Sequence, residues 1–357
     1  MGVLRVVGLL DGGGLRGLGV RVALSGGVDS AVCTVLLKQS GFEPCGIHFV
    51  MHGADSDADS AAEAARRMGI PLQVLNLTDE FDKTVIRYFV DAYKSGLTPN
   101  PCVFCNRNMK FAHLFATADK EGIDKVATGH YARIEKCGAE YLLKKSLNAA
   151  KDQSYVLYSL RREWLSRLMF PLGTLTKDEV RELAHGEALP NADKPDSQDI
   201  CFIPDGNYTS FIEARCGHVK ESGNFLDMKG NVIGRHDGIL NYTIGQRRGL
   251  KTGFGERLYV ISKNSADNTV TLGHNSDLFG KRLSASSVNI LVGNTLPESM
   301  RVCAKVRYSM KEQPATVFFE GNKRMTVEFD EPQRAFTSGQ SVVLYDGDTV
   351  IGGGIIA

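Results

Sequence analysis

The sequence predicts an α/β protein: a doubly wound parallel sheet domain, then a small central β-containing domain, then a C-terminal antiparallel β-barrel. Two observations lead to this fold class. Apolar strands alternate with amphipathic helices from residue 20 to about residue 133, which is typical of a parallel sheet that binds its ligand at the carboxyl ends of its strands. After about residue 217, short β-rich runs are separated by glycine and asparagine turns, as in small antiparallel barrels.

Chain length and the N-terminal residues suggest the domain boundaries. A chain of 357 residues is too long for one hydrophobic core. The predicted domains are the sheet domain at 20–217, the central domain at 218–283 and the barrel at 284–357. Residues 1–19 are expected to be a disordered extension. DGGG interrupts their apolar stretch, which argues against a secretory signal, while Arg5 and Arg16 leave an organelle-targeting peptide as an alternative.

The elements of the sheet domain follow from local patterns. VRVAL (20–24) reads as a strand, and the helix after it places Val32, Val35 and Leu36 on one face. The other predicted elements are strands at 46–51, 72–77 and 125–130, helices at 60–69, 79–96, 154–160 and 177–188, and a hairpin that pairs 132–136 with 141–145.

Composition limits the function classes. The 42 basic and 41 acidic residues give a net charge of +1, so a nucleic-acid partner must be met by local basic patches. No apolar run approaches the ~18 residues that span a bilayer, so we expect no membrane association. Eight scattered cysteines without a secretory signal indicate a reducing compartment, and we expect a cytoplasmic protein.

The string SGGVDS, residues 25–30, lies between the first strand and the first helix. Its two glycines allow a tight turn, and the first amides of the helix then face whatever sits in the turn. Unpaired amides and the helix dipole favour an anion there, which predicts a phosphate-binding loop. The loop is not a Walker A motif, because that motif requires a lysine absent here. A small-residue turn without a ligand is the alternative.

Two further motifs carry cysteines. In TPNPCVFCN (98–106), two prolines predict an extended, rigid loop that presents Cys102 and Cys105. Nearby cationic side chains that could favour thiolate formation are Lys94, Arg107 and Lys110. A zinc half-site and inert buried thiols are alternatives, although no second CxxC exists to complete a zinc site. The polar segment ADKPDSQDICFIP (192–204) holds a single thiol, that of Cys201.

SGGVDS resembles the signature of the ATP-pyrophosphatase (PP-loop) superfamily, and from residue 20 onward the chain closely resembles the tRNA-specific 2-thiouridylases. The motifs that carry the resemblance are SGGVDS, TPNPC..CN, ATGHYAR (127–133), KDQSY (151–155), FPLG.LTK.EVR (170–181), ADKPDSQDICFI and NYTIGQRRGL (241–250). Their order and spacing make a chance match negligible.

The resemblance implies a two-stage reaction on a wobble uridine of tRNA. ATP first adenylates the 2-carbonyl oxygen and releases pyrophosphate, and a cysteine persulfide then delivers sulfur to that carbon as AMP departs. Cys201 matches the persulfide cysteine, and Cys105 matches its partner, which either frees a sulfide from the persulfide or resolves the resulting disulfide. Two thiols are needed because a persulfide gives up only its outer sulfur.

The resemblance also implies binding residues and partners. The ATP-binding positions are Ala23, Leu24, Ser25, Gly26, Gly27, Val28, Asp29, Ser30, Phe49 and Gly129. The tRNA-binding positions are Asn100, Pro101, Cys102, His130, Lys151, Asp152, Gln153, Arg307, Tyr308 and Gln340, the last three for the anticodon arm. We assign no metal ligand. The implied cofactors are ATP with Mg²⁺ and persulfide sulfur from a sulfur-relay protein or a cysteine desulfurase, and we expect a monomer.

Several alternatives stay open at this point. Many relatives have aspartate where this chain has Cys102, so an iron–sulfur cluster held by Cys102, Cys105 and Cys201 is possible but not favoured, being one thiolate short of the usual four. His130 can be a packed core histidine, and the pair Arg307 and Tyr308 ordinary barrel surface. The competing functions are another PP-loop adenylating enzyme and a sulfur-carrier scaffold. The expected basic rim comprises Lys144, Lys145, Lys151, Arg247 and Arg248.

Overall fold

The computed structural model describes residues 17–53, 56–194, 199–217, 221–250, 256–293, 296–321 and 323–357. Most of the extension predicted at 1–19 lies outside the described residues, as do residues 195–198 of the third motif. The first strand begins at Gly19. The domain boundaries drawn from the sequence stay predictions.

A five-stranded parallel sheet forms the first domain, in the order β3-β2-β1-β4-β7. Its strands are β1 (Gly19–Ala23), β2 (Glu43–Val50), β3 (Leu72–Asn76), β4 (Lys125–Ala127) and β7 (Leu168–Met169). The chain adds β2 and β3 on one side of β1, and β4 and β7 on the other. The carboxyl ends of β1 and β4 therefore flank a topological switch point, where sheets of this kind bind ligands. The predicted doubly wound sheet is confirmed.

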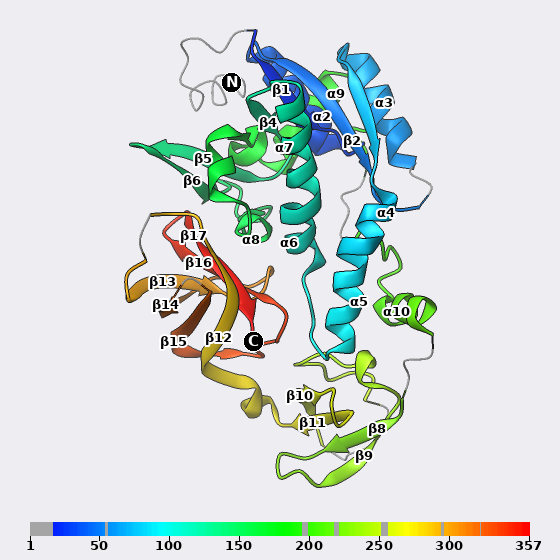
Figure 1. The fold of residues 1–357 in the computed structure, drawn as a ribbon, viewed down its shortest axis with the longest axis vertical. Coiled ribbons are helices and arrows are strands. Elements are labelled where there is room, and N and C mark those ends of the chain that lie inside the picture. Colours follow the sequence, from blue (N-terminus) through cyan, green and yellow to red (C-terminus); the bar gives the residue numbers. More distant parts are fainter. Residues whose placement is uncertain are drawn as a thin grey trace.

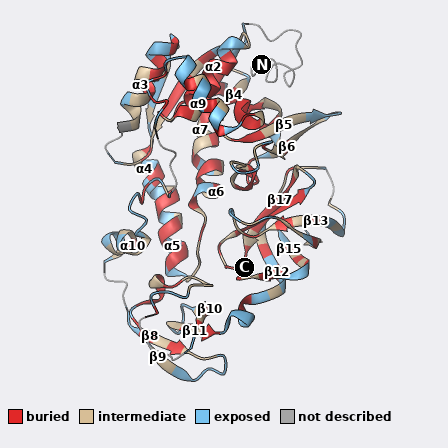
Figure 2. Ribbon diagram, turned by 180° about the vertical axis from the view of Figure 1, so that it is seen from behind, coloured by how far each residue is buried: buried red, intermediate tan, exposed pale blue. Residues whose placement is uncertain are grey.

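Helices cover both faces of this sheet (Figure 1). Val20 and Val22 of β1 belong to a core shared with α2 (Val28–Gln39), α3 (Ser56–Met68) and α9 (Lys177–Gly186). Val126 of β4 belongs to a second core with α7 (Phe111–Lys120). Figure 2 shows the buried residues concentrated where these helices meet the sheet. Because successive side chains of a strand point to opposite faces of the sheet, alternate residues of the strands pack into these two cores.

The long helix predicted at 79–96 forms, with a π-helical stretch in its middle. It consists of α4 (Thr78–Phe81), the π-helix η1 (Asp82–Ile86) and α5 (Arg87–Lys94). Phe81 and Phe89 are buried in a core that also contains residues of the central domain. This helix therefore joins the sheet domain to the central domain through shared apolar packing.

The central domain is built on a four-stranded sheet in the order β10-β11-β8-β9. The strands are β8 (Gly223–Leu226), β9 (Val232–His236), β10 (Tyr259–Asn264) and β11 (Thr269–Gly273), and α10 (Tyr208–Cys216) precedes them. Phe225 and Tyr242 are fully or almost fully buried and pack edge to face, with ring centroids 5.2 Å apart. Their core is continuous with that of α5.

The C-terminal domain is a closed six-stranded antiparallel barrel. Its strands are β12 (Phe279–Ile290), β13 (Ser299–Lys305), β14 (Gln313–Glu320), β15 (Arg324–Arg334), β16 (Ser341–Asp346) and β17 (Thr349–Ile356). β12 pairs with both β15 and β17, which closes the barrel and removes its free edges. The predicted barrel is confirmed.

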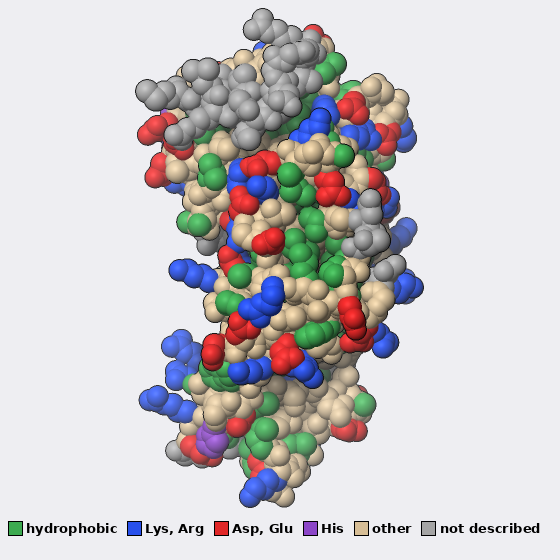
Figure 3. Space-filling model, turned by 90° about the vertical axis from the view of Figure 1, so that its left-hand side faces the viewer, with side chains coloured by type: hydrophobic (Ala, Val, Ile, Leu, Met, Phe, Trp, Pro, Cys, Tyr) green, Lys and Arg blue, Asp and Glu red, His purple; other side chains and the backbone are tan. Residues whose placement is uncertain are grey.

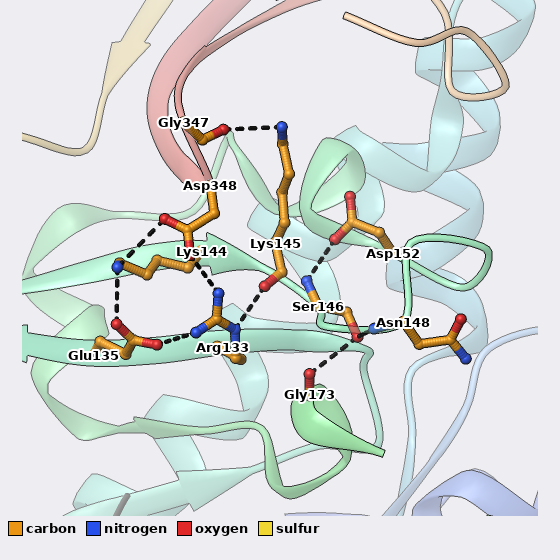
Figure 4. A network of polar contacts seen from close by, with 10 residues as sticks. All are labelled: Arg133, Glu135, Lys144, Lys145, Ser146, Asn148, Asp152, Gly173, Gly347 and Asp348. Atoms are coloured by element: carbon orange, nitrogen blue, oxygen red, sulfur yellow. Dashed lines mark hydrogen bonds and ion pairs between the residues drawn. The ribbon is translucent and has the colours of Figure 1, made fainter. Parts of the chain in front are cut away.

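The predicted hairpin, β5 (Ala132–Cys137) and β6 (Glu140–Lys145), attaches the sheet domain to the barrel, because β6 pairs with β17. A charged network reinforces this contact (Figure 4). Arg133 pairs with Glu135 of its own strand and with Asp348 of the barrel. Lys144 lies 2.8 Å from Glu135 and 3.3 Å from Asp348. The hairpin therefore contacts the barrel through both backbone and side-chain interactions.

Candidate active site

The loop after β1 is shaped by its own serines. Ser30 Oγ accepts from the backbone N–H of Ser25 at 3.1 Å and donates to the carbonyl of Gly27 at 2.9 Å. Gly26 has φ +76°, and a Cβ there would lie 2.5 Å from the carbonyl oxygen of Asp57, so this position requires glycine. Gly27 is the N-cap of α2 and provides no side-chain cap, so the first helical amides are left for a ligand.

Asp29, in the first turn of α2, is held by two residues from other elements. Tyr131 Oη donates to Asp29 Oδ1 at 2.8 Å, and Lys177 Nζ lies 2.7 Å from the same oxygen. Lys177 is buried at the start of α9, where Thr176 and Glu179 form a capping box. Sequence reasoning assigned no role to Tyr131 or Lys177, although both lie in motifs that carried the resemblance.

The other predicted nucleotide positions lie at the same end of the sheet. Gly129 follows β4, and a Cβ there would lie 2.7 Å from the carbonyl carbon of Asp29 and 2.8 Å from the nitrogen of Ser30. The loop after β4 therefore packs directly on the phosphate loop. Phe49 lies near the carboxyl end of β2, the strand next to β1. Gly129 thus lies at the switch point between β1 and β4, and Phe49 lies at the same end of the sheet on β2, the neighbour of β1.

The third motif is anchored on the phosphate loop. The buried Asn191 donates through Nδ2 to the carbonyl of Gly26 at 3.1 Å. Lys194 Nζ lies 2.5 Å from Asp57 Oδ1 and 3.4 Å from the Gly26 carbonyl. The segment that leads to Cys201 is therefore attached to the loop beside the predicted nucleotide site.

The extended loop predicted for TPNPCVFCN is wrong, because the cysteines lie on a short helix, α6 (Pro101–Cys105). Pro101 occupies the first turn, where proline loses no intrahelical hydrogen bond. The Asn100 side chain caps this helix by accepting from the backbone N–H groups of Cys102 at 3.2 Å and Val103 at 3.4 Å. The dipeptide Asn100–Pro101 therefore marks the start of a helix. The extended segment ends at Asn100, the residue before α6.

Helix α6 continues into a π-helix, η2 (Asn106–Lys110), and then into α7. Cys102 reaches the surface, whereas Cys105 is buried in the core shared with the central domain. Phe202, which follows Cys201, is buried in the same core. The packing therefore brings the two cysteine motifs to one place. All eight cysteines are free thiols.

The three thiols of these motifs influence one another electrostatically. Burial raises the pKa of Cys105 to about 11, Lys110 opposes the rise, and the charges of Cys201 and Cys102 add to it. Desolvation likewise raises the pKa of Cys201, with Lys110 lowering it and Cys102 raising it. Within the described part of the chain, no group of three or more His, Cys, Asp or Glu residues is placed to hold a metal ion.

Of the three cationic residues expected near these thiols, Lys110 is the one whose charge lowers the pKa of Cys105 and of Cys201. Arg107 is engaged elsewhere, since its Nη1 donates to the carbonyl of Ser159 at 2.8 Å and to Asn289 Oδ1 at 2.9 Å. Lys94 is exposed at the end of α5. The expectation for this group therefore holds for Lys110.

His130 packs among aromatic rings at the end of β4, and its predicted contact with tRNA stays a prediction. Its Nδ1 lies 2.8 Å from Thr128 Oγ1, and its ring packs at 5.7 Å from that of Phe111 and 6.0 Å from that of Phe170. Burial and the charge of Lys110 lower the pKa of His130 to about 3. The imidazole is therefore neutral at physiological pH, and it can offer a hydrogen bond but no positive charge.

Two of the predicted tRNA contacts in KDQSY bind backbone. Asp152 Oδ1 accepts from the N–H of Ser146 at 2.9 Å, and Gln153 Oε1 accepts from the N–H of Tyr131 at 2.8 Å. Lys151 lies in the turn just before them. Gln153 therefore holds the ATGHYAR segment and Asp152 holds the turn that follows β6. Their contact with tRNA stays a prediction.

The residues predicted to bind the anticodon arm lie in loops of the barrel, Arg307 and Tyr308 shortly after β13 and Gln340 just before β16. Arg307 Nη2 donates to the carbonyl of Ala335 at 2.9 Å, and Tyr308 is 45% exposed. Gln340 Nε2 donates to the carbonyl of Thr98 at 2.9 Å, which ties the barrel to the segment that leads into α6. An exposed tyrosine ring of this kind is suited to base stacking.

A cavity of about 430 Å³ separates α6 from the barrel, and sequence reasoning missed it. Asn100, Phe104 and Tyr88 line it from the sheet domain, and Ser287 and Gly339 from the barrel. Tyr88 and Phe104 stack with ring centroids 4.2 Å apart. No sequence signal indicates this cavity, because its walls come from separate domains.

The charged surface is mixed in sign. Figure 3 shows basic and acidic side chains interspersed on the face it presents. Of the expected basic rim, Lys145 pairs with Glu312, and Lys144 belongs to the hairpin network. Arg247 and Arg248 are exposed on the central domain.

Among the helices of the described residues, none has the length and apolar character needed to cross a membrane.

Family models match nearly the whole chain. Residues 18–205 match the model described as tRNA methyl transferase HUP domain, and residues 209–274 the model described as tRNA methyl transferase PRC-barrel domain. Residues 281–356 match the model described as aminomethyltransferase beta-barrel domain. The three matched ranges follow the three domains of the fold.

Curated relatives match over almost their full length. The tRNA-specific 2-thiouridylase MnmA of Clostridioides difficile is 47% identical over 94% of this chain and 97% of its own length. MnmA 1 of Caldanaerobacter subterraneus subsp. tengcongensis is 45% identical over 94% of this chain and 97% of its own. MnmA of Acetivibrio thermocellus is 44% identical, with coverages of 94% and 98%.

Proposed function

The chain belongs to the tRNA-specific 2-thiouridylase family, and from this premise we propose how its residues divide the reaction. It is a tRNA-uridine 2-sulfurtransferase that uses ATP. The proposal covers what membership leaves open: which residues bind each substrate, how the sulfur moves, and in which setting the protein works.

In the first half-reaction, the uridine 2-carbonyl oxygen attacks the α-phosphorus of ATP, and pyrophosphate leaves. We assign the phosphates to the amides at the start of α2, a role supported by the uncapped Gly27 and by the close packing of Gly129 on the loop. Mg²⁺ would be held mainly by the phosphates and water, as is usual for nucleotide sites, with Asp29 as the acid of the loop. The ion would neutralise charge on the departing pyrophosphate.

In the second half-reaction, the outer sulfur of a Cys201 persulfide attacks carbon 2, and AMP leaves with the bonding electron pair. The Cys105 thiolate then attacks Cys201 Sγ. The bond between Cys201 and the transferred sulfur breaks, its electrons go to that sulfur as 2-thiouridine, and a Cys105–Cys201 disulfide forms. A dithiol reductant restores both thiols. The alternative order, in which Cys105 first frees a sulfide, uses the same two residues.

The observation that supports this assignment is that Cys105 and Phe202, the residue after Cys201, are buried in one apolar core although their motifs lie far apart in the chain. The free state of all eight cysteines supports a reducing, cytoplasmic setting. We also propose that the protein is a monomer and that it receives its sulfur from a relay protein or a cysteine desulfurase.

The test compares Cys105→Ser and Cys201→Ser with Cys137→Ser, an exposed thiol in the β5–β6 hairpin. Cys201→Ser should lose persulfide labelling and thiolation but keep tRNA-dependent pyrophosphate release. Cys105→Ser should still accept labelled sulfur on Cys201 but leave the tRNA unthiolated. Cys137→Ser should behave as the unmodified protein. Thiolated tRNA from Cys201→Ser would contradict the assignment, and pyrophosphate release without tRNA would favour another PP-loop activity.

A further inference from the structure

We propose that Asn191 is a positioning residue for adenylation, whose side chain holds the Gly26–Gly27 peptide so that its N–H group faces the phosphates of ATP. The inference deepens the proposed function and rests on it, because the phosphates are assigned there to the amides at the start of α2. Asn191 lies outside the predicted site residues, one position before the third motif. It neither gains nor loses a bond in the reaction.

The Gly26–Gly27 peptide has one buried side and one accessible side. Its carbonyl oxygen accepts from Asn191 Nδ2 at 3.1 Å, and Asn191 is only 5% exposed. The nitrogen of Gly27 lies 3.4 Å from the Oγ of Ser25, which is an exposed residue of the loop. The carbonyl and N–H groups of a planar trans peptide point in opposite directions. The contact with Asn191 therefore turns the N–H toward the accessible side of the loop.

The local sequence does not select this orientation. Turning a peptide over changes ψ of the residue before it and φ of the residue after it, and Gly27 has no Cβ to resist the change. Gly27 has φ −92°, and a half turn would bring it to positive φ, where glycine is favoured. The reversed peptide would present its carbonyl oxygen to the phosphates and repel them. A contact from outside the loop is therefore needed to keep the N–H in the anion-binding orientation.

The backbone that carries Asn191 is fixed by apolar packing. Leu189 and Ala192, which flank it, are both 5% exposed and belong to the core that also contains Val28 of α2. The N–H of Ala192 donates to the carbonyl of Leu189 at 3.2 Å, which closes the turn around Asn191. Asn191 therefore reaches the loop from a support that packs in the same core as the helix behind the loop.

The side chain of Asn191 also carries an atom that does not stabilise the fold. Its Oδ1 is buried and has no hydrogen-bond partner among the described residues. An unpaired buried carbonyl oxygen destabilises the folded state, and an apolar side chain of similar size would avoid this effect. The amide at position 191 is therefore explained by its hydrogen bond to the phosphate loop rather than by stability.

The test compares Asn191→Leu with Asn241→Leu, a matched control in the central domain. Asn241 Nδ2 donates to the carbonyl of Gly238 at 3.3 Å, so both variants remove an asparagine that holds a glycine carbonyl. The affinities for ATP and for adenosine are measured by equilibrium dialysis without tRNA. We expect Asn191→Leu to weaken ATP binding by at least ~10-fold, the scale of losing one hydrogen bond to a charged group. Adenosine binding should be unchanged, and Asn241→Leu should change neither affinity.

Thermal melting separates positioning from a structural role. Asn191→Leu should melt at the same temperature as the unmodified protein or higher, because the variant lacks the unpaired buried oxygen. In tRNA-dependent pyrophosphate release, its kcat/KM for ATP should fall by a factor similar to the loss of ATP affinity. If Asn191→Leu does not fold, Asn191→Ala provides the same comparisons.

Two outcomes would overturn the proposal. One is an unchanged ATP affinity in a folded Asn191→Leu variant, and the other is an equal loss of ATP and adenosine binding. Failure of the proposed function would look different. An unmodified protein that binds ATP no more tightly than adenosine would contradict the assignment of the phosphates to the loop.

Discussion

Lys177 Nζ lies 2.7 Å from Asp29 Oδ1, although the two residues are 148 positions apart in the chain. The contact connects α9 to the first turn of the helix that follows the phosphate loop. Lys177 is only 7% exposed, so water does not screen this pair strongly. The acid of the loop is therefore held in one orientation by a residue from a distant motif.

This pair predicts that Lys177→Met will impair adenylation and spare persulfide loading. Removing the buried Lys177 leaves the partly exposed Asp29 carboxylate without its cation. Tyr131 alone then holds Asp29, and we expect tRNA-dependent pyrophosphate release to fall at least ~10-fold, with Asp29→Ala falling ~100-fold, the scale of losing one preorganised electrostatic contact. Sulfur labelling of Cys201 serves as the internal control. Normal pyrophosphate release by Lys177→Met would show that the pair is not needed for catalysis.

A second prediction concerns Cys102, which lies beside the reactive pair. Cys102→Asp, which replaces the thiol by a carboxylate, should retain thiolation if Cys105 and Cys201 carry the chemistry. An iron–sulfur cluster would lose a soft ligand in the same variant and bind less iron. The measurement is anaerobic purification with iron quantification and a thiolation time course. Activity that follows bound iron, with no activity in iron-free protein supplied with persulfide, would exclude the two-cysteine mechanism.

A third prediction separates two barrel residues. Arg307→Ala should weaken tRNA binding and flatten its salt dependence by about one phosphate contact. Tyr308→Ala should weaken binding with the salt slope unchanged, because stacking releases no counterions. ATP binding without tRNA should be normal in both variants. Binding isotherms at several salt concentrations decide the matter, and an unchanged affinity and slope for Arg307→Ala would show that the anticodon arm lies elsewhere.

A fourth prediction concerns the stability of the central domain. Lys263 Nζ is buried without a hydrogen-bond partner among the described residues, and burial lowers the pKa of Lys263 to about 8 from 10.5. Between these two pH values the unfolded chain binds more protons than the folded one, so this residue makes stability rise as pH increases from about 8 to about 10.5. Lys263→Met should be more stable at pH 7 and lose that rise. Thermal melting from pH 7 to pH 10.5 tests this, and a less stable Lys263→Met variant at pH 7 would contradict it.

The sequence alone predicted features that depend on local backbone requirements. Gly26 needs a positive φ and space beside Asp57, and SGGVDS contains a glycine there in a strand–turn–helix context. The alternating and helical apolar patterns likewise predicted the parallel sheet and the barrel. Pro101 shows the limit of such rules. The same dipeptide N-P suits an extended loop or a capped helix, and only packing of Val103 and Cys105 into the interior selects the helix.

The tertiary structure decided which distant residues meet. The order β3-β2-β1-β4-β7 places Gly129 against Asp29, and the packing of α9 adds Lys177 to the same acid. The packing of α6 against the central domain buries Cys105 in the core that also contains Phe202, the residue after Cys201, which no spacing in the sequence reveals. The periodicity of apolar residues determines which helices and strands form, because it depends on side chains only a few positions apart. Contacts such as these depend on how whole elements pack, because their energy comes from burying surfaces that belong to separate parts of the chain.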